Sequence, residues 1–229
     1  MKQNEQALID NFFKDLEKYA DKKGIKTYKS STGGSDRILG GDYILKSGSK
    51  YLLIEFKDNF SQLSTEGKKE KMCSLCVALN NLKNKSMKKL SLECHFISWG
   101  EKIDYLIRMQ FNKYFNAICN QTVFKGSLNL PKLSNSNTIK IDEIFIEKAI
   151  SCDTGLYFTD FNNYINWIFS ITSSTGNTDL ALLVKNDSGC GSYPFSSLSD
   201  LNHWIESNEN ILKETKSESA QSRTSKRRR

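Results

Sequence analysis

The sequence predicts an α/β fold in which helices flank a mixed β-sheet. Three observations indicate this. An amphipathic helix pattern opens the chain, an apolar β-hairpin pattern follows it, and residues 1–100 read in the order helix, three strands, helix and strand. Beyond this core, residues 101–215 are predicted to form a mostly helical extension, and residues 216–229 a disordered basic tail.

The first predicted element is a helix over residues 4–22, because apolar side chains recur there at spacings of three and four. Gly24 ends this helix. Residues 25–30 are predicted to form a short strand, and the Gly- and Ser-rich residues 31–41 a loop. Glu5 lies within the apolar stripe of the helix and is expected to point inward, where a carboxylate needs a partner.

The predicted hairpin joins DYILKS to KYLLIEFK through a Gly-Ser dipeptide at residues 48–49, which favours a type II′ turn. This turn sets the register so that Asp42 faces Glu55, with Lys57 two residues farther on. One face of the hairpin is then wholly apolar and consists of Tyr43, Leu45, Leu52, Ile54 and Phe56. Carboxylates opposed in this way, with Cβ atoms about 4.5–5.5 Å apart, repel unless a cation lies between them. The pattern therefore indicates a divalent metal ion at this end of the hairpin.

Less regular patterns follow the hairpin. The Ser-Thr pair at residues 64–65 is expected to cap a helix, and residues 91–100 to form a buried strand. A further helix is predicted over residues 102–119. Farther on, FNNYINWIFSI and SDLNHWIESNENILKE read as helices and residues 180–186 as a strand, whereas IDEIFIEKAI fits either.

The six cysteines are too scattered for a disulfide scaffold, so they are predicted to be reduced thiols. The N-terminal residues include acidic side chains and no cleavage-site pattern, which argues against a targeting peptide. No apolar run approaches the roughly 18 residues of a membrane span. We therefore expect an intracellular protein that is cytoplasmic or nucleoid-associated, or nuclear if its source is eukaryotic or viral, and that has no membrane partner.

The helix, loop and hairpin together resemble the PD-(D/E)xK nuclease superfamily, which includes many restriction endonucleases and the archaeal-type Holliday junction resolvases. The residues that carry this resemblance are Glu5, Asp42, Glu55 and Lys57. Residues 31–34 lie where resolvase-like members have a hydroxyl-rich loop, and Gly41 replaces the proline that often precedes the aspartate. The resemblance covers residues 1–100 and implies a restriction endonuclease-like core.

This resemblance implies a nuclease that hydrolyses phosphodiester bonds with Mg²⁺ or Mn²⁺, as an endonuclease of the restriction, resolvase or repair type. The metal ligands that it implies are Asp42, Glu55, Glu5 and the backbone carbonyl of Phe56. Lys57 would position the attacking water, help to deprotonate it, or stabilise the transition state. DNA is the expected substrate, and RNA is not excluded. A homodimer, or a partner ATPase or helicase, is compatible with this class.

The net charge of +7 is distributed unevenly along the chain. Residues 211–229 hold seven basic and two acidic residues, which places +5 in this segment. Nucleic-acid phosphates are expected to contact this tail and the basic residues that follow the hairpin. The expected contacts are Lys68, Lys69, Lys71, Arg227, Arg228 and Arg229.

The same charged residues also fit a purely structural role, in which Asp42 and Glu55 are solvated strand ends and Lys57 forms an ordinary ion pair. Glu5 would then only favour the helix dipole. A different functional class is a non-catalytic nucleic-acid-binding or assembly subunit, which keeps the fold and needs no Mg²⁺. The presence of only two histidines argues against His-metal nucleases and Ser/His/Asp hydrolases.

Overall fold

The protein was analysed as a computed structural model that describes most of the chain. The described residues are 5–33, 36–127, 129–132, 139–140, 142–172, 180–186 and 189–208. The basic tail predicted over residues 216–229, with Arg227, Arg228 and Arg229, lies outside them.

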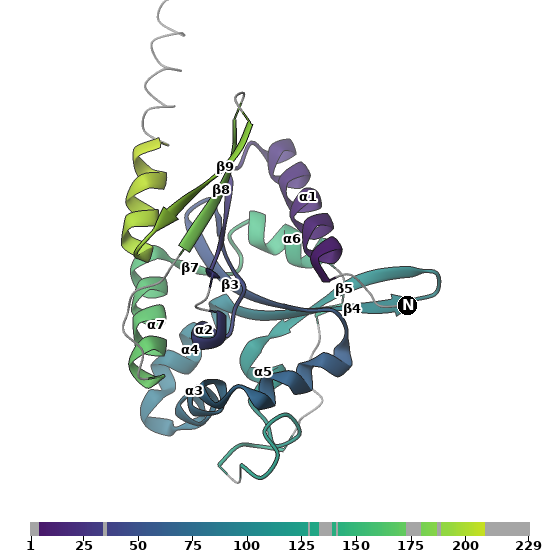
Figure 1. Cartoon of the computed structure of the whole chain (residues 1–229), viewed down its shortest axis with the longest axis vertical. Helices are drawn as coiled ribbons and strands as arrows, with labels where there is room; N and C mark the ends of the chain where they lie inside the picture. Colours follow the sequence, from purple (N-terminus) through teal and green to yellow (C-terminus); the bar gives the residue numbers. More distant parts are fainter. Residues whose placement is uncertain are drawn as a thin grey trace, which may run out of the picture.

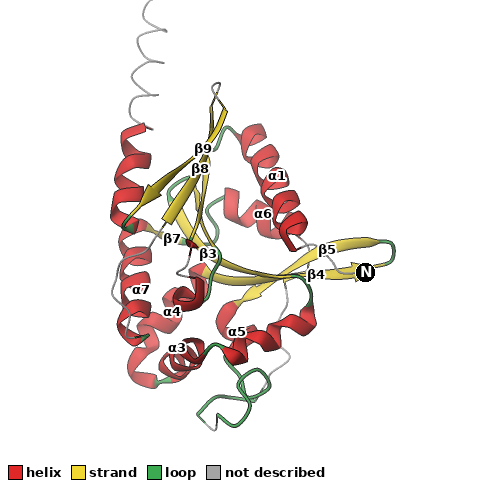
Figure 2. Cartoon of the chain, in the orientation of Figure 1, coloured by secondary structure: helices red, strands yellow, loops and turns green. Residues whose placement is uncertain are grey.

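Nine strands of the described residues form one mixed sheet (Figures 1 and 2). Its order is β6-β5-β4-β3-β2-β1-β8-β9, and the short β7 pairs with β3 off this path. Among the described strands only β3 and β4 pair in parallel. The strands are β1 (Thr27–Ser31), β2 (Tyr43–Ser47), β3 (Lys50–Lys57), β4 (His95–Ile103), β5 (Leu106–Lys113), β6 (Ile139–Lys140), β7 (Leu156–Tyr157), β8 (Leu180–Asn186) and β9 (Gly189–Phe195).

Helices cover both faces of this sheet (Figure 2), so the predicted α/β class with a mixed, helix-flanked sheet is confirmed. The helices α1 and α6 pack on one face, and α3, α4, α5 and α7 on the other. Their bounds are α1 (Glu5–Lys23), α2 (Asp36–Leu39), η2 (Phe60–Lys68, a 3-10 helix), α3 (Glu70–Asn80), η3 (Leu82–Asn84), α4 (Lys85–Cys94), α5 (Tyr114–Ile118), α6 (Asp142–Ile150) and α7 (Phe158–Ile171), followed by a helical segment at residues 198–208. No helix in the described part of the chain has the length and apolar character needed to cross a membrane.

The hairpin β2–β3 has the predicted register, since Tyr43 pairs with Ile54 and Ser47 with Lys50. Its predicted apolar face packs beneath α1 and α6, while the other face packs against the opposite helical layer. The first helix and strand also match their predictions to within two residues. Local turn chemistry and strand alternation therefore determine this part of the fold.

The prediction of one helix that begins at residues 64–65 is wrong. The structure has the 3-10 helix η2 over Phe60–Lys68 and a separate helix, α3, over Glu70–Asn80. Asn59 caps the 3-10 helix η2, where its side chain accepts a hydrogen bond from the backbone N–H of Ser61 at 3.1 Å. Lys69 then takes an extended conformation that separates η2 from α3. The strand predicted over residues 91–100 likewise begins only at His95, because α4 continues to Cys94.

The helix predicted over residues 102–119 is also wrong, since most of that stretch forms the second strand of a β-hairpin with β4. Ile103 pairs with Leu106 across a two-residue turn. Asp104 takes a positive φ of 56° in this turn, a conformation that aspartate tolerates better than most residues. Pairing with β4 satisfies the backbone groups of the strand, and only α5 of the predicted helix is helical.

The region predicted to be a mostly helical extension contains helices and also supplies strands to both edges of the sheet. Beyond residue 100, β5 and β6 extend one edge, while β8 and β9 extend the other by pairing with β1. The strand expected at residues 180–186 and the helix expected in FNNYINWIFSI are confirmed, and IDEIFIEKAI is resolved as the helix α6. The boundary expected at residue 100 falls within β4.

The prediction that all six cysteines are reduced thiols is wrong for one pair. Cys76 of α3 and Cys119 at the end of α5 form a disulfide, and their Cα atoms lie 4.9 Å apart. The two cysteines are 43 residues apart in the sequence, and their contact depends on how the two helices pack, so no local pattern predicts it.

Reduction of this disulfide is expected to lower the free energy of unfolding by about 2–4 kcal/mol, because the bond restricts the unfolded chain over a long loop. For a chain of this size that corresponds to a fall of roughly 5–15 °C in Tm. Thermal unfolding with and without dithiothreitol measures the effect. The Cys76→Ala/Cys119→Ala variant should become insensitive to the reductant, whereas Cys73→Ala, which changes a neighbouring free thiol, should stay sensitive. Equal sensitivity of both variants would contradict the prediction.

Candidate active site

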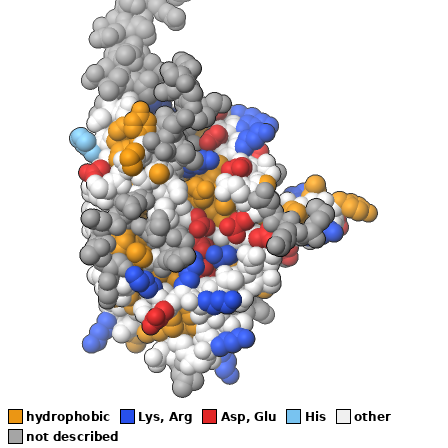
Figure 3. All heavy atoms as spheres, viewed as in Figure 1, with side chains coloured by type: hydrophobic (Ala, Val, Ile, Leu, Met, Phe, Trp, Pro, Cys, Tyr) orange, Lys and Arg blue, Asp and Glu red, His pale blue; other side chains and the backbone are white. Residues whose placement is uncertain are grey.

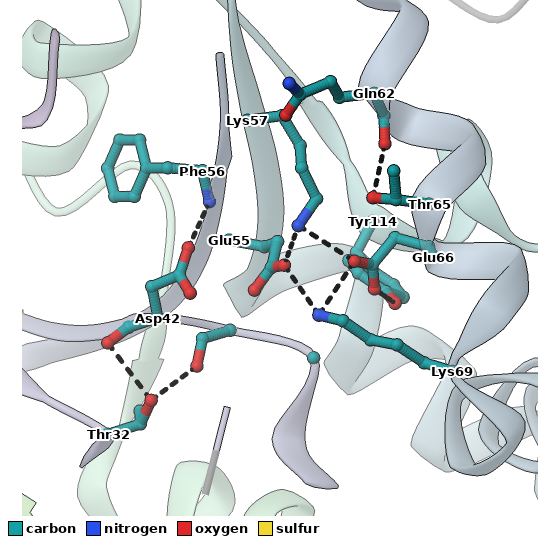
Figure 4. Close-up of polar contacts among 12 residues, drawn as sticks. Thr32, Asp42, Glu55, Phe56, Lys57, Gln62, Thr65, Glu66, Lys69 and Tyr114 are labelled. Atoms are coloured by element: carbon teal, nitrogen blue, oxygen red, sulfur yellow. Dashed lines mark hydrogen bonds and ion pairs between the residues drawn. The ribbon is translucent and has the colours of Figure 1, made fainter. Parts of the chain in front are cut away.

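The charged end of the β2–β3 hairpin brings Asp42 close to Glu55, although the paired ladder ends at Tyr43 and Ile54 and does not include the predicted facing of these two carboxylates. The backbone N–H of Asp42 donates to the carbonyl of Ile54 at 2.9 Å, which holds Asp42 just beyond the last strand pair. One carboxylate oxygen of Asp42 accepts a hydrogen bond from the backbone N–H of Phe56 at 2.7 Å (Figure 4). Phe56 therefore adjoins this site through its backbone, while its ring packs on the opposite face of the sheet.

The loop before Asp42 is held by a buried threonine. The Thr32 hydroxyl donates to the carbonyl of Gly41 at 2.7 Å, and its backbone N–H donates to the carbonyl of Asp42 at 2.9 Å. A Cβ atom at Gly41 would lie 2.4 Å from the side chain of Leu53, so glycine is the residue that fits here without a shift of Leu53. Close packing thus explains the absence of a proline before the aspartate.

The buried His95 also holds the loop before Asp42, through a hydrogen bond to Gly40. Since a carbonyl can only accept, His95 donates from Nε2 to the Gly40 carbonyl at 2.7 Å. Its Nδ1 then accepts from the Tyr164 hydroxyl at 2.9 Å, which fixes the neutral tautomer. Burial lowers the pKa of His95 to about 4, so this pair of hydrogen bonds persists at neutral pH.

Glu55 belongs to a group of four charged side chains, Glu55, Lys57, Glu66 and Lys69, which we term the four-charge cluster (Figure 4). Lys57 pairs with Glu55 and lies 3.0 Å from Glu66. Lys69 lies 2.9 Å from the same oxygen of Glu55 and 2.8 Å from Glu66. The two carboxylates are 1% and 0% exposed, so the lysines neutralise charges that water does not reach.

Glu66 was not among the predicted site residues. Its second oxygen accepts a hydrogen bond from the Tyr114 hydroxyl at 2.7 Å. Burial alone would raise the pKa of Glu66, but the charges of Lys57 and Lys69 lower it to about 2. The sequence holds one signal for this residue, because Glu66 and Lys69 are three residues apart and adjoin each other on a helical turn directly after the charged strand.

The two hairpin carboxylates have pKa values that differ from that of Glu66. Burial raises the pKa of Asp42 to about 6, against the smaller lowering effects of the Phe56 N–H and of Lys57. Burial also raises the pKa of Glu55, and the nearby charges of Asp42 and Glu66 add to the rise. Burial is therefore the main reason why both groups hold a proton more readily than a carboxylate in water.

The other residues predicted for the site lie around Asp42 and the four-charge cluster and differ in their contacts. Glu5, the first residue of α1, is half-buried, and its charge raises the pKa of Asp42, although its side chain forms no hydrogen bond or ion pair with another described residue. Lys68 and Lys71 are exposed beside the site. Lys69, expected to contact phosphates with them, instead directs its ammonium group to Glu55 and Glu66.

The carboxylate oxygens of Asp42 and Glu55 are the candidate ligands for a divalent cation. No group of three or more His, Cys, Asp or Glu side chains in the described residues is arranged to hold a metal ion. Glu55 nevertheless has a buried oxygen, Oε2, without a hydrogen-bond partner, and Figure 4 shows it on the side of Asp42. With all groups ionised, Asp42 and the four-charge cluster hold three carboxylates and two ammonium groups, a net charge of −1. Two hard oxygen ligands and an uncompensated charge fit Mg²⁺ or Mn²⁺ that keeps several waters.

Comparison with protein-family models, with curated proteins and with solved structures found no match to this chain. What the protein does must therefore be inferred from its own side chains.

The raised pKa of Asp42 predicts how stability depends on pH in the absence of metal. Between its ordinary value of 3.8 and about 6, the folded protein holds more protons than the unfolded chain, so the free energy of unfolding falls as pH rises through this window. Allowing for the partial exposure of the side chain, the fall due to Asp42 is about 2 kcal/mol. Asp42→Asn keeps an acceptor for the Phe56 N–H and should show a smaller fall. Urea unfolding in EDTA from pH 4 to pH 7 tests this, and parallel curves for both proteins would contradict it.

Proposed function

We propose that the protein is a metal-dependent nuclease that hydrolyses phosphodiester bonds, with DNA as its substrate and RNA not excluded. The observation that carries the proposal is the pair of carboxylates at one end of the hairpin, Asp42 and Glu55. Two lysines contact Oε1 of Glu55, and its buried Oε2, on the side of Asp42, has no hydrogen-bond partner. This arrangement agrees with a PD-(D/E)xK, restriction endonuclease-like core, in which an aspartate precedes a hairpin that ends in Glu-x-Lys.

A bound Mg²⁺ or Mn²⁺ would activate a water and neutralise charge on the scissile phosphate. The chain would hold it through Asp42 and Glu55, with Glu5 near enough to add a third negative charge. The implied ligation by the Phe56 carbonyl remains part of this proposal, since Phe56 adjoins Asp42 through its backbone.

Lys57 has a narrower role than the sequence suggested. Burial alone would lower its pKa, but the charges of Glu55 and Glu66 raise it above the ordinary value. Lys57 therefore stays protonated at neutral pH and stabilises negative charge or orients water, rather than acting as a base. Lys69 shares both of its carboxylate partners and provides a second buried positive charge at the same place.

The face that carries the site also carries basic side chains suited to a polyanion. In Figure 3, acidic and basic side chains gather over the middle of the face shown. Lys68 and Lys71 are exposed at the junction of η2 and α3, and they flank Lys69 of the four-charge cluster in the chain. Phosphate contacts of this kind add affinity without reading sequence.

A second candidate is a non-catalytic nucleic-acid-binding or assembly subunit. The observation that favours it is the four-charge cluster itself, in which two lysines already neutralise two glutamates without a metal ion. Such a subunit would bind nucleic acid equally well in Mg²⁺ and in EDTA.

Conservative variants of the site residues are expected to lose cleavage while keeping the fold. Asp42→Asn, Glu55→Gln and Lys57→Met should each lower the cleavage rate by roughly 100-fold or more, because each removes a charge that acts on the reacting phosphate. The assay follows supercoiled plasmid, single-stranded DNA, a four-way junction and RNA with Mg²⁺, Mn²⁺ or EDTA.

Lys14→Met on the exposed face of α1 is the matched control and should cleave like the wild type. Circular dichroism checks that each variant is folded. Full activity in any site variant would refute the site assignment, and metal-independent binding without cleavage would favour the second candidate.

The exposed lysines are expected to set the salt dependence of binding. Lys68→Ala/Lys71→Ala should weaken nucleic-acid binding and reduce the slope of log K against log salt concentration by about 0.9 for each phosphate that the variant no longer neutralises. Fluorescence anisotropy in EDTA over a range of salt concentrations measures this. Lys83→Ala/Lys85→Ala removes two exposed charges beyond the far end of α3 and should keep the wild-type slope. If both double variants change the slope equally, general charge rather than this surface determines binding.

A further inference from the structure

The hairpin formed by β4 and β5 extends beyond the end of the sheet at which the candidate active site lies. Lys57, the last residue of β3, pairs with Trp99 of β4, whereas β4 continues to Ile103. Four further residues at about 3.3 Å each carry the hairpin roughly 13 Å past the end of β3. We term residues 100–109 the β4–β5 arm, which projects from the body of the molecule in Figures 1 and 2.

The base of the arm adjoins the strand that carries the site. A Cβ atom at Gly100 would lie 2.8 Å from the carbonyl oxygen of Asp58, the residue after Lys57. Phe60, two residues after Asp58 and 61% exposed, packs on the ring of Trp99 with centroids 5.5 Å apart. The exposed ring of Phe60 therefore lies on the base of the arm, beside the strand that carries the site.

The tip of the arm exposes large apolar side chains. Tyr105 is 99% exposed and Leu106 is 61% exposed, and none of the described residues covers them. Ile103 and Ile107 flank them with about two fifths of their surface exposed. The β4–β5 pairing is complete up to the turn, so the arm presents these side chains on a regular two-stranded support. Figure 3 shows hydrophobic side chains covering the end of this projection.

The charges of the arm indicate what kind of contact it makes. Its acidic residues, Glu101 and Asp104, balance its basic ones, Lys102 and Arg108. A segment without net charge gains little from the phosphate backbone, unlike the surface of Lys68 and Lys71. Its apolar tip instead suits the faces of bases, on which aromatic side chains stack and between which aliphatic side chains insert.

We propose that the tip of the β4–β5 arm, through Tyr105 and Leu106, contacts exposed base faces of the nucleic acid bound at the candidate active site, and so directs the site to substrates with unpaired bases. Such substrates are junctions, gaps and single-stranded segments. This inference rests on the proposed function, because the arm begins beside the strand that carries the site, where the nucleic acid is proposed to bind. A single exposed aromatic ring offers stacking to an unpaired base, whereas a fully paired duplex must first be unstacked at an energetic cost.

The test uses the full chain with Tyr105→Ser/Leu106→Ser, and Tyr157→Ser as the matched control, since Tyr157 is 60% exposed on the distant strand β7. Fluorescence anisotropy in EDTA measures the binding of single-stranded DNA, a gapped duplex, a four-way junction and a blunt duplex. The arm variant should bind the first three roughly 5- to 100-fold more weakly, with little change for the blunt duplex. This loss should be nearly independent of salt. A 2-aminopurine base in the gap should change its fluorescence with the wild type and the control but not with the arm variant.

Wild-type affinity of the arm variant for all four nucleic acids would overturn the inference, as would a wild type that binds none of them. Sedimentation velocity tests a second copy of this chain as the occupant. A wild-type dimer that becomes monomeric in the arm variant, with nucleic-acid binding unchanged, would also overturn it.

Hydrolysis of bis(4-nitrophenyl) phosphate, which is too small to reach the arm, tests the site alone with Mg²⁺ or Mn²⁺. If the wild type hydrolyses it and the arm variant does so equally, the arm acts on binding and the inference is supported. If neither protein hydrolyses any phosphodiester but the arm variant has lost its binding of unpaired bases, the nuclease proposal fails and the inference about the arm stands.

Discussion

The burial of several charges at the end of β3 is the constraint on which this structure depends. Glu55 and Glu66 are almost wholly excluded from solvent, and a buried carboxylate is tolerated only where opposite charges or hydrogen bonds reach it. Lys57 and Lys69 each reach both carboxylates. Three consecutive elements, β3, η2 and the start of α3, are thus joined through the four-charge cluster, because removing any member would leave a buried charge unpaired.

A second layer of hydrogen bonds connects this cluster to the hydrophobic core. Tyr114 donates to Glu66 and stacks on His95, with ring centroids 4.2 Å apart, and His95 in turn holds the loop before Asp42. Thr32 binds the same loop from β1. Tyr114 and Tyr164 also belong to the core beneath the sheet. Core packing and the positions of the charged groups are therefore determined by the same side chains.

The parallel pairing of β3 with β4 relates the site to its surroundings. The first residue of β4, His95, lies below the loop that carries Asp42, and its last residues leave the body of the protein as the β4–β5 arm. Between His95 and the arm, β4 pairs with β3, the strand that carries Glu55 and Lys57. The same strand therefore includes the histidine that holds the Asp42 loop and the start of the β4–β5 arm.

The sequence by itself determined the β2–β3 register, the apolar face of that hairpin and the closeness of Asp42 to Glu55, because a two-residue turn and strand alternation act over a few neighbouring residues. It did not determine the strand at residues 106–113, whose helical appearance is overridden by pairing with β4. Only the tertiary structure decided that Glu66 and Lys69 join the site and that Cys76 meets Cys119. These contacts depend on how η2, α3 and α5 pack on the sheet, and the free energy of that packing is spread over residues too far apart in the chain for any local pattern to record.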